Sequence, residues 1–498
     1  MKKKHVEKKN RTSFNFLKFL FNKEQLPDWM VIIGLCVIGY IIIKICYPYP
    51  ITMSDSLGYI QAAEIDKFSF YRPFGYSFFI QIIHGISSNI HAVFIAQMII
   101  YFLATAMFSF TIKYFFKPNN KIIWYILLVI FTLSPMGLYL ANCIMSDLLY
   151  GVIIYLMISS FIFVIQKRSW IGLFLFMIFL YISLFIRYSS MVFPVVFIPL
   201  FFMIKGNIRW VGIIGTVFIS VIFNAQIKRD MKENTKFDQF STGFDGWQIA
   251  NNTLHIIPFI DLDPEDIKDK ELRKFHEFVL LYNDSILKIT DNGKIVSSKF
   301  LWFKDLPLKD YLSLQIKENQ QTYAHNWIRL GSTIFKDYGW FLIKKYPFKF
   351  MRYYYLLNAK SVFYPESLGI LYNDVPISSS KETSWYNIKE DEITDAKYPV
   401  YSKFLANFDR ILWSVSWIAI LAVSILALIN KKKIKFNSNQ KKTIWAIFIF
   451  GVIYYASVVF ASPIEFRYWF AIRCVNFAYF CIFLNELLRM KKDKQNVS

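Results

Sequence analysis

The run Trp29-Met-Val-Ile-Ile-Gly-Leu-Cys-Val-Ile-Gly-Tyr-Ile-Ile-Ile-Lys-Ile-Cys-Tyr47 decides the fold class of this chain. Only one of its side chains is charged, and its length is close to the ~20 apolar residues with which an α-helix crosses a bilayer. A basic, aromatic segment precedes the run, and no small-residue cleavage site follows it. We therefore interpret it as a retained membrane span and not as a signal peptide.

The composition extends this interpretation to the whole chain. Of its 498 residues, 55% are hydrophobic and 18% are charged, and the mean hydropathy is +0.35. Most of such a surface must face lipid. The ~10-residue alternating segments of a β-barrel are not evident. We predict an all-α polytopic membrane protein with about ten spans: 29–47, 89–112, 122–139, 147–165, 170–186, 191–204, 208–225, 411–429, 443–461 and 468–488.

The distribution of Lys and Arg sets the orientation. If both termini are cytoplasmic, the inner segments hold 25 basic residues and the short outer connections hold four. The positive-inside rule then predicts a multi-pass plasma membrane protein with both termini in the cytoplasm. The net charge of +22 follows the same pattern, so we expect contact with anionic membrane lipids and not with nucleic acid.

Five regions follow from these spans. They are a basic, amphipathic N-terminus (1–28), an N-terminal membrane core (29–225), a long outer segment (226–410), the last spans (411–488) and a basic tail (489–498). Residues 12–22 are typical of an interfacial helix. The outer segment has helical patterning at 263–290 and 320–345, so we expect a helical cap on the membrane surface; an independent soluble domain is the less favoured alternative. Within it, Trp247 and nearby amides fit a packed turn better than a sugar contact.

The five cysteines lie in or beside predicted spans, so neither a disulfide framework nor a Cys-based metal site is indicated. No motif fixes a metal, although Asp55 together with Asp147 could hold a divalent cation.

The first outer connection carries the most informative polar residues. Asp55 lies in Thr52-Met-Ser-Asp-Ser-Leu-Gly-Tyr59, and Arg72-Pro-Phe-Gly-Tyr76 follows. An acidic group at the mouth of a membrane helix, followed by a rigid Arg-Pro-x-Gly-Tyr turn, is unusual as plain packing. The simpler alternative is that Ser54 or Asp55 caps the next helix.

Other outer connections carry Asp147, Arg187 and the sequence Glu465-Phe-Arg467-Tyr468. Ionisable groups near the membrane cost ~2.5–3.5 kcal/mol at a helix centre on insertion scales, so they usually pair or serve a function. All of these groups belong to one membrane boundary, where we expect them to converge. Alternatively, Asp147 caps a helix, and Arg187 extends to the headgroups as an ordinary end-of-helix residue. Arg467 could also pair with Glu465 or Asp55 for structure only.

The order of these features resembles the GT-C superfamily of glycosyltransferases, which use polyprenyl-phosphate-linked sugars and include protein O-mannosyltransferases and lipid A aminoarabinose transferases. The family has an Asp in the first outer loop and then an Arg-Pro-Pro-Gly-Tyr-Pro-like element, which Asp55 and Arg72–Tyr76 match. Phe74 and Ser77 stand where the family has proline. The resemblance covers 28–205 well and 460–490 weakly.

Three further elements match in order: Met145-Ser-Asp147, Ile186-Arg187-Tyr188 and Arg467-Tyr468. Asp147 stands where Glu is common in the family, and Tyr188 replaces a proline. The resemblance implies transfer of a sugar from a polyprenyl-phosphate donor to a glycan, lipid or protein acceptor. No other cofactor is implied with certainty.

Glycosyl transfer from a phosphate-linked sugar needs a carboxylate base and a fixed cation for the departing phosphate. We expect Asp55 to be the base and Asp147 to orient the acceptor or a cation. The residues expected to bind the phosphate or the substrate are Arg72, Arg187, Arg467, Tyr59, Tyr76 and Tyr468. The alternatives are a transporter or flippase of lipid-linked glycans and a glycan polymerase with a lipid diphosphate donor.

Overall fold

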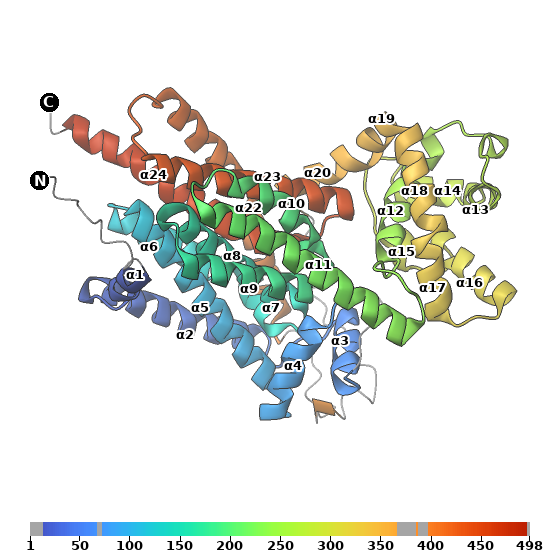
Figure 1. Cartoon of the computed structure of the whole chain (residues 1–498), viewed down its shortest axis with the longest axis horizontal. Coiled ribbons are helices and arrows are strands. Elements are labelled where there is room, and N and C mark those ends of the chain that lie inside the picture. Colours follow the sequence, from blue (N-terminus) through green and yellow to red (C-terminus); the bar gives the residue numbers. More distant parts are fainter. Residues whose placement is uncertain (1–12, 67–71, 366–384, 387–396, 496–498) are drawn as a thin grey trace, which may run out of the picture.

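The apolar runs form a bundle of long helices in the computed structural model, which describes residues 13–66, 72–365, 385–386 and 397–495 (Figure 1). Eight helical segments within these ranges are long and apolar enough to cross a membrane. They comprise α2 (Leu26–Cys46), α5 (Ile90–Phe116), α6 (Lys121–Thr132) with α7 (Pro135–Asn142), α8 (Ser146–Lys167), α11 (Asn207–Thr235), α22 (Pro399–Ile429), α23 (Ser438–Ala461) and α24 (Arg473–Gln495) with the 3₁₀ helix Phe466–Ile472 before it. The chain is an all-α, multi-pass membrane protein.

Two predicted spans are shorter helices. Residues 170–186 form α9 (Trp170–Ile186), and 191–204 contain α10 (Val192–Phe201), preceded by a 3₁₀ turn. The predicted span 122–139 is divided into α6 and α7. Ser134 caps α7 and Pro135 is its first residue, so α6 ends just before them. The prediction of about ten apolar spans thus corresponds to eight long segments and two short helices.

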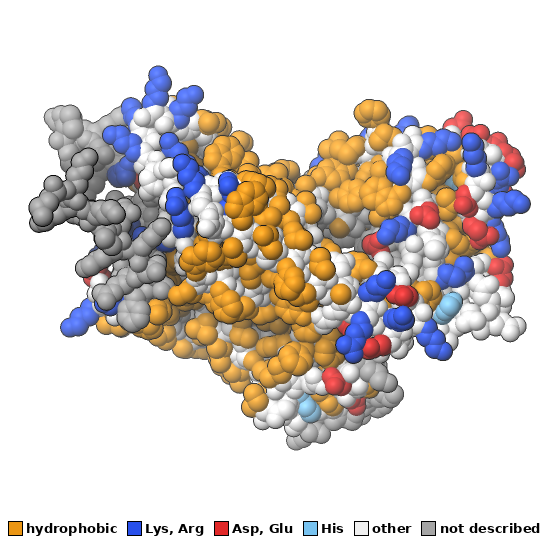
Figure 2. Space-filling model, in the orientation of Figure 1, with side chains coloured by type: hydrophobic (Ala, Val, Ile, Leu, Met, Phe, Trp, Pro, Cys, Tyr) orange, Lys and Arg blue, Asp and Glu red, His pale blue; other side chains and the backbone are white. Residues whose placement is uncertain are grey.

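Helix α8 lies at the centre of the bundle, and most of its side chains are buried. Its Gly151 allows Phe470 to approach, because a Cβ there would lie 2.4 Å from the Phe470 ring. The outer helices instead expose large apolar side chains, and Figure 2 shows them as a continuous hydrophobic surface. This surface is the lipid-facing belt, and its members include Ile33, Val37, Ile41, Ile214, Phe218, Val221, Ile418, Leu421 and Ile425.

One end of the bundle holds α1 (Ser13–Leu20), the α5–α6 connection and the end of α24 (Figure 1). Asn119 N donates to Asn485 Oδ1 at 2.7 Å there. Lys and Arg side chains gather at this end in Figure 2. The helix expected at 12–22 is present as α1. Its Phe16 and Leu20 are buried against the bundle, whereas Phe21 is 77% exposed.

The opposite end carries a helical cap, Phe244–Phe363. Helices occur where the sequence predicted them and also elsewhere. They are α12 (Phe244–Leu254), α13 (Lys270–Leu280), α14 (Asn283–Ile289), α15 (Lys299–Trp302), α16 (Pro307–Asn319), α17 (Tyr323–Ser332), α18 (Ile334–Lys345), α19 (Pro347–Phe350) and α20 (Leu356–Phe363). Fully buried Trp247, Phe275 and Phe335 give the cap an apolar core of its own. The cap is smaller than 226–410, because α11 and α22 continue into that range.

Two asparagines of the cap hold the α23–α24 connection. Asn252 Nδ2 donates to the carbonyl oxygens of Phe460 and Ala461 at 2.9 and 3.1 Å. Asn358 donates to the Ser462 carbonyl at 2.7 Å and accepts from Ile464 N at 2.9 Å. The cap therefore fixes the backbone immediately before Glu465.

Candidate functional site

A short backbone pairing brings two connections of the bundle together. Ile51 and Cys143 form a parallel bridge, in which Ile51 N donates to Asn142 O at 2.7 Å and Ile144 N donates to Ile51 O at 2.9 Å. Helices α3 (Ser54–Glu64) and α8 begin three residues after the bridged positions. The starts of these helices, each with an aspartate in its first turn, therefore lie side by side.

The start of α3 fixes Asp55. Ser56 Oγ accepts from Met53 N and donates to Ile144 O, each at 2.8 Å, so Ser56 secures the helix start. The Asp55 side chain is left to pair with Arg72, whose Nη2 lies 2.5 Å from Asp55 Oδ1. Arg72 Nη1 also donates to the Asp55 backbone oxygen at 3.0 Å.

Asp147 and Arg187 form a second pair where α8 begins and α9 ends. Arg187 Nη1 lies 2.5 Å from Asp147 Oδ1. The helix dipole favours an anion at the start of α8 and a cation at the end of α9. Tyr150 stands one turn beyond Asp147, with its ring centre 5.6 Å from the Arg187 guanidinium carbon. The sequence prediction did not include Tyr150, although its position three residues after Asp147 on the same helix could have indicated it.

Arg467 joins the two pairs. Its Nη1 lies 3.6 Å from Asp55 Oδ2 and 3.8 Å from Asp147 Oδ2. Its Nε lies 2.6 Å from Glu465 Oε2, although this contact lacks the alignment of a hydrogen bond. We name these groups the six-charge cluster: Asp55, Arg72, Asp147, Arg187, Glu465 and Arg467. The expected convergence of the charged residues is present, and Glu465, which the sequence offered only as a structural partner of Arg467, is part of it.

The three predicted tyrosines differ in position. Tyr59 bonds Ser146 Oγ at 2.8 Å, and its ring centre lies 4.7 Å from the Arg72 guanidinium carbon. Tyr468 lies beside two guanidinium groups, with its ring centre 5.5 Å from Arg467 and 5.8 Å from Arg187. Tyr76 is fully buried behind Tyr59 and donates to Gln97 Oε1 at 3.0 Å. Tyr76 is thus placed to support Tyr59.

The cluster balances three guanidinium groups with three carboxylates. Its exposure is uneven, because the side chains of Asp55 and Glu465 are 30% and 33% exposed, whereas that of Asp147 is 5% exposed. Burial alone raises the pKa of Asp55, but the neighbouring guanidinium groups, Arg72 first, outweigh burial and hold that pKa below its ordinary value. Asp55 is therefore ionised at neutral pH.

The capping and end-of-helix alternatives do not describe Asp55, Asp147 or Arg187, whereas the side chain of Ser54 lies outside the described residues. The pairing of Arg467 with Glu465 and Asp55 is present, as the structural alternative for Arg467 expected. Neither Asp55 nor Asp147 makes a side-chain capping bond at the start of its helix. Arg187 turns to Asp147 instead of extending away from the protein. In the cap, Trp247 is fully buried and donates to Trp327 O at 3.0 Å, so it packs as the sequence favoured, although it lies in helix α12 and not in a turn.

Arginine side chains occupy the space between Asp55 and Asp147 where a divalent cation could be expected. Arg467 Nη1 is within 4 Å of an oxygen of each carboxylate, and each carboxylate has a second arginine partner. A metal ion would have to displace these positive charges. Within the described ranges, no group of three or more His, Cys, Asp or Glu side chains is arranged to hold a metal.

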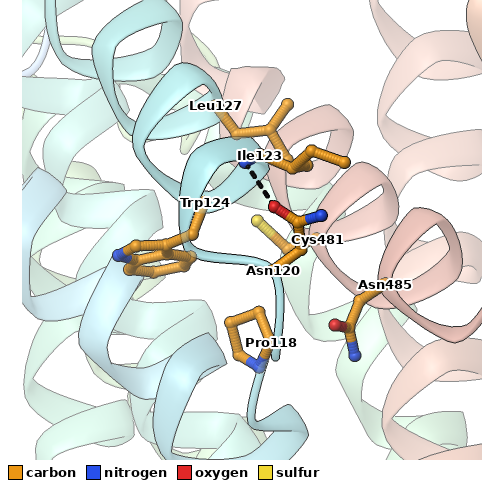
Figure 3. Close-up of a pocket in the computed structure, with 7 residues that line it drawn as sticks. All are labelled: Pro118, Asn120, Ile123, Trp124, Leu127, Cys481 and Asn485. Atoms are coloured by element: carbon orange, nitrogen blue, oxygen red, sulfur yellow. Dashed lines mark hydrogen bonds between the residues drawn. The ribbon is translucent and has the colours of Figure 1, made fainter. Parts of the chain in front are cut away.

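Two other features lie away from the cluster. At the α1 end, a small crevice with a cavity volume of about 10 Å³ lies between α6 and α24 (Figure 3). It is lined by Pro118, Asn120, Ile123, Trp124, Leu127, Cys481 and Asn485. Ligand sites usually occupy ~300–1,000 Å³, whereas this crevice has room for about one water molecule, so it is too small for a typical ligand. Between α22 and α24, Asp409 and Arg473 form a two-pronged ion pair at 2.7 and 2.9 Å.

Comparison with known protein families, curated protein sequences and solved structures gives no match to this chain. The GT-C resemblance therefore stays a hypothesis that rests on the order of a few short motifs. Any functional assignment must come from the geometry of the six-charge cluster.

Proposed function

We propose that this chain is a GT-C-type membrane glycosyltransferase, which transfers a sugar from a polyprenyl-phosphate carrier to an acceptor hydroxyl at the cap end of the bundle. The observation that carries the proposal is the position of Arg467. Its guanidinium lies within 4 Å of the carboxylates of Asp55, Asp147 and Glu465, which come from three separate connections. Ionisable groups near the membrane are costly and usually mark a functional site, so this concentration of charge favours a charged substrate there.

Arg467 is the proposed anchor for the donor phosphate. A planar guanidinium matches phosphate oxygens with paired donors and stays charged. Its partner Glu465 is the most exposed carboxylate of the cluster, and their contact is poorly aligned. A phosphate oxygen can therefore replace the Glu465 carboxylate without the loss of a strong hydrogen bond. Arg187, which is 26% exposed, is placed to take a second oxygen.

Asp55 is the proposed base because it combines exposure with proximity to Arg467. It accepts the proton of the acceptor hydroxyl while that oxygen bonds to the anomeric carbon. The bond from this carbon to the phosphate oxygen breaks, and the lipid phosphate leaves with the electron pair. Attack opposite the phosphate inverts the anomeric centre. Negative charge on the bound phosphate offsets the guanidinium groups, so it raises the pKa of Asp55 and strengthens it as a base.

Asp147 is the proposed positioning residue. Its carboxylate is almost fully buried and holds Arg187. A buried carboxylate with two arginine neighbours is better suited to fix their orientation than to exchange protons with an acceptor.

The proposed location is the plasma membrane, with the cap outside and both termini in the cytoplasm. The Lys and Arg side chains at the α1 end support this orientation. Nucleotide sugars are not available outside that membrane, so a transferase facing outward needs a lipid-carried donor. The exposed belt supplies a lipid-facing surface against which a polyprenyl tail can lie.

The test is a transfer assay with the purified full chain in nanodiscs. Donors are polyprenyl-phosphate sugars of several kinds, and acceptors are membrane lipids, lipid-linked glycans and cell-wall fragments. Asp55→Asn should lower transfer by about 10²–10⁴-fold, the range expected for loss of a general base. Asp55→Glu should keep part of the activity, and Arg229→Gln on exposed α11 is the matched control for charge removal.

Full transfer by Asp55→Asn would reject the proposed base. Movement of a lipid-linked glycan across vesicles without bond transfer would favour a transporter. A lengthened glycan made from a lipid diphosphate donor would favour a polymerase.

A further inference from the structure

A second unusual group of side chains lies in the cap. The ammonium of Lys309, on α16, is surrounded by aromatic rings from α12, α15 and α17. We name this group the Lys309 cage: the distances from Lys309 Nζ to the ring centres are 4.3 Å for Trp327, 5.2 Å for Trp247, 5.5 Å for Tyr323 and 5.9 Å for Trp302. Lys309 Nζ also donates to the Tyr323 hydroxyl at 2.9 Å.

Lys309 lacks a counter-ion among the described residues. No carboxylate lies within 4.0 Å of its ammonium in those parts of the chain. Burial lowers the pKa of Lys309 to about 8. Tyr323 takes one of the three ammonium donors, and the ring faces supply only cation–π attraction for the others. An anion would supply the charge that this site lacks.

The rings divide into a floor and a rim. Trp247 and Trp327 stack at 3.9 Å and are buried, so they form the floor. Trp302 and Tyr323 are 47% and 48% exposed, and neighbouring Phe303 is also exposed. Large aromatic faces next to a few polar groups are typical of small-molecule sites. Flat exposed rings suit the apolar C–H face of a sugar ring.

We propose that the Lys309 cage binds an anionic saccharide, with the rings of Trp302 and Tyr323 against the sugar and Lys309 facing its acidic group. Lipid is less favoured as the occupant, because α16 lies at the end of the molecule opposite α1, beyond the apolar belt (Figure 1). A neutral sugar would leave the cation without a counter-ion.

This proposal goes beyond the transferase and does not depend on it. Binding to the cage can be measured without any transfer, so one proposal can fail while the other holds. If both hold, the cage is a second contact for an acidic acceptor glycan, separate from the six-charge cluster.

The test is a titration of saccharide probes into the full chain in detergent, with binding measured by calorimetry and by tryptophan fluorescence. The probes are a trimer of galacturonic acid, a phosphorylated trisaccharide and neutral maltotriose. At least one acidic probe should bind at least about tenfold more tightly than the neutral one. Lys309→Met should remove this preference, whereas Lys309→Arg should keep it. Lys317→Met, an exposed change on the same helix, is the matched control.

Trp302→Ala separates a loss of binding from a loss of folding. Because the Trp302 ring is half exposed, its removal should weaken binding and leave the unfolding midpoint unchanged. Affinity of the wild type should fall as the pH rises through about 8, and that of Lys309→Arg should not. The proposal is overturned if neither acidic probe binds, or if Lys309→Met binds the acidic probes as tightly as the wild type does. It is also overturned if the variants lose only binding to anionic lipid vesicles.

Discussion

Ile51 pairs with Cys143 in a parallel backbone bridge, and each residue stands four positions before an aspartate of the six-charge cluster. The matched spacing places Asp55 and Asp147 in the first turns of two neighbouring helices. Arg467 then reaches both carboxylates. The cluster therefore depends on a contact between two connections that are 92 residues apart in sequence.

The first prediction concerns Gly75 and the packing of α4 against the end of α9, next to Arg187. Gly75 begins α4 (Gly75–Ile86), and a Cβ there would lie 2.3 Å from the backbone oxygen of Phe185, near the end of α9. Gly75→Ala should force the two helices apart, lower the free energy of unfolding by about 1–3 kcal/mol and weaken binding of polyprenyl monophosphate. Gly85→Ala, on the same helix with open space around it, should leave both quantities unchanged or slightly improved. Equal effects of the two changes would contradict this account.

Glu465 tests the competition for Arg467. Replacing it with Gln removes the negative charge that lies 2.6 Å from Arg467 Nε. Glu465→Gln should tighten polyprenyl monophosphate binding about 3- to 10-fold, or about 1 kcal/mol, because the carboxylate that competes with the phosphate for Arg467 is gone. Glu233→Gln, which removes an exposed carboxylate on α11, should have no effect. Weaker binding by Glu465→Gln would mean that Glu465 holds Arg467 in place instead of competing with the phosphate.

The lowered pKa of Asp55 predicts a direction for the pH dependence of stability. Its stabilising contribution is complete above the unfolded aspartate pKa, which is about 3.9, and is lost as the pH falls through the lower folded value. The difference in unfolding midpoint between wild type and Asp55→Asn should stay constant from about pH 5 to 8 and shrink below about pH 4. Thermal unfolding in detergent over this range measures it. A difference that grew on acidification would show that Asp55 is protonated more easily in the folded chain.

The last prediction concerns the stability of the buried ion pair between Asp409 on α22 and Arg473 on α24. Asp409 is fully buried, pairs with Arg473 and accepts from Met136 N at 3.1 Å. Asp409→Ala should cost about 3–5 kcal/mol, because it leaves a guanidinium buried without a partner. The double variant Asp409→Leu with Arg473→Met should recover most of this loss. Unfolding by SDS in mixed micelles compares the variants, and a loss below about 1 kcal/mol for Asp409→Ala would show that Arg473 finds another partner.

Much of the bundle could be predicted because apolar runs must become helices in lipid, where every backbone polar group needs an internal partner. The ends of α11 and α22 could not be predicted from the apolar runs, because both helices continue beyond these runs as polar helices. Arg473 lay inside the predicted span 468–488, and the cost of an unpaired charge there already required a partner. Only the folded chain identifies that partner as Asp409.

The sequence by itself determined the all-α membrane class, the apolar spans and the candidate charged residues, since these follow from local composition and the cost of burying charge. Tertiary structure alone decided which charges meet: Arg72 with Asp55, Arg187 with Asp147, and Arg467 between the pairs. It also created the Lys309 cage from three helices and a short helical turn of the cap. Ion pairs and aromatic contacts act over a few ångströms between residues far apart in sequence, so only packing of the helices can select them.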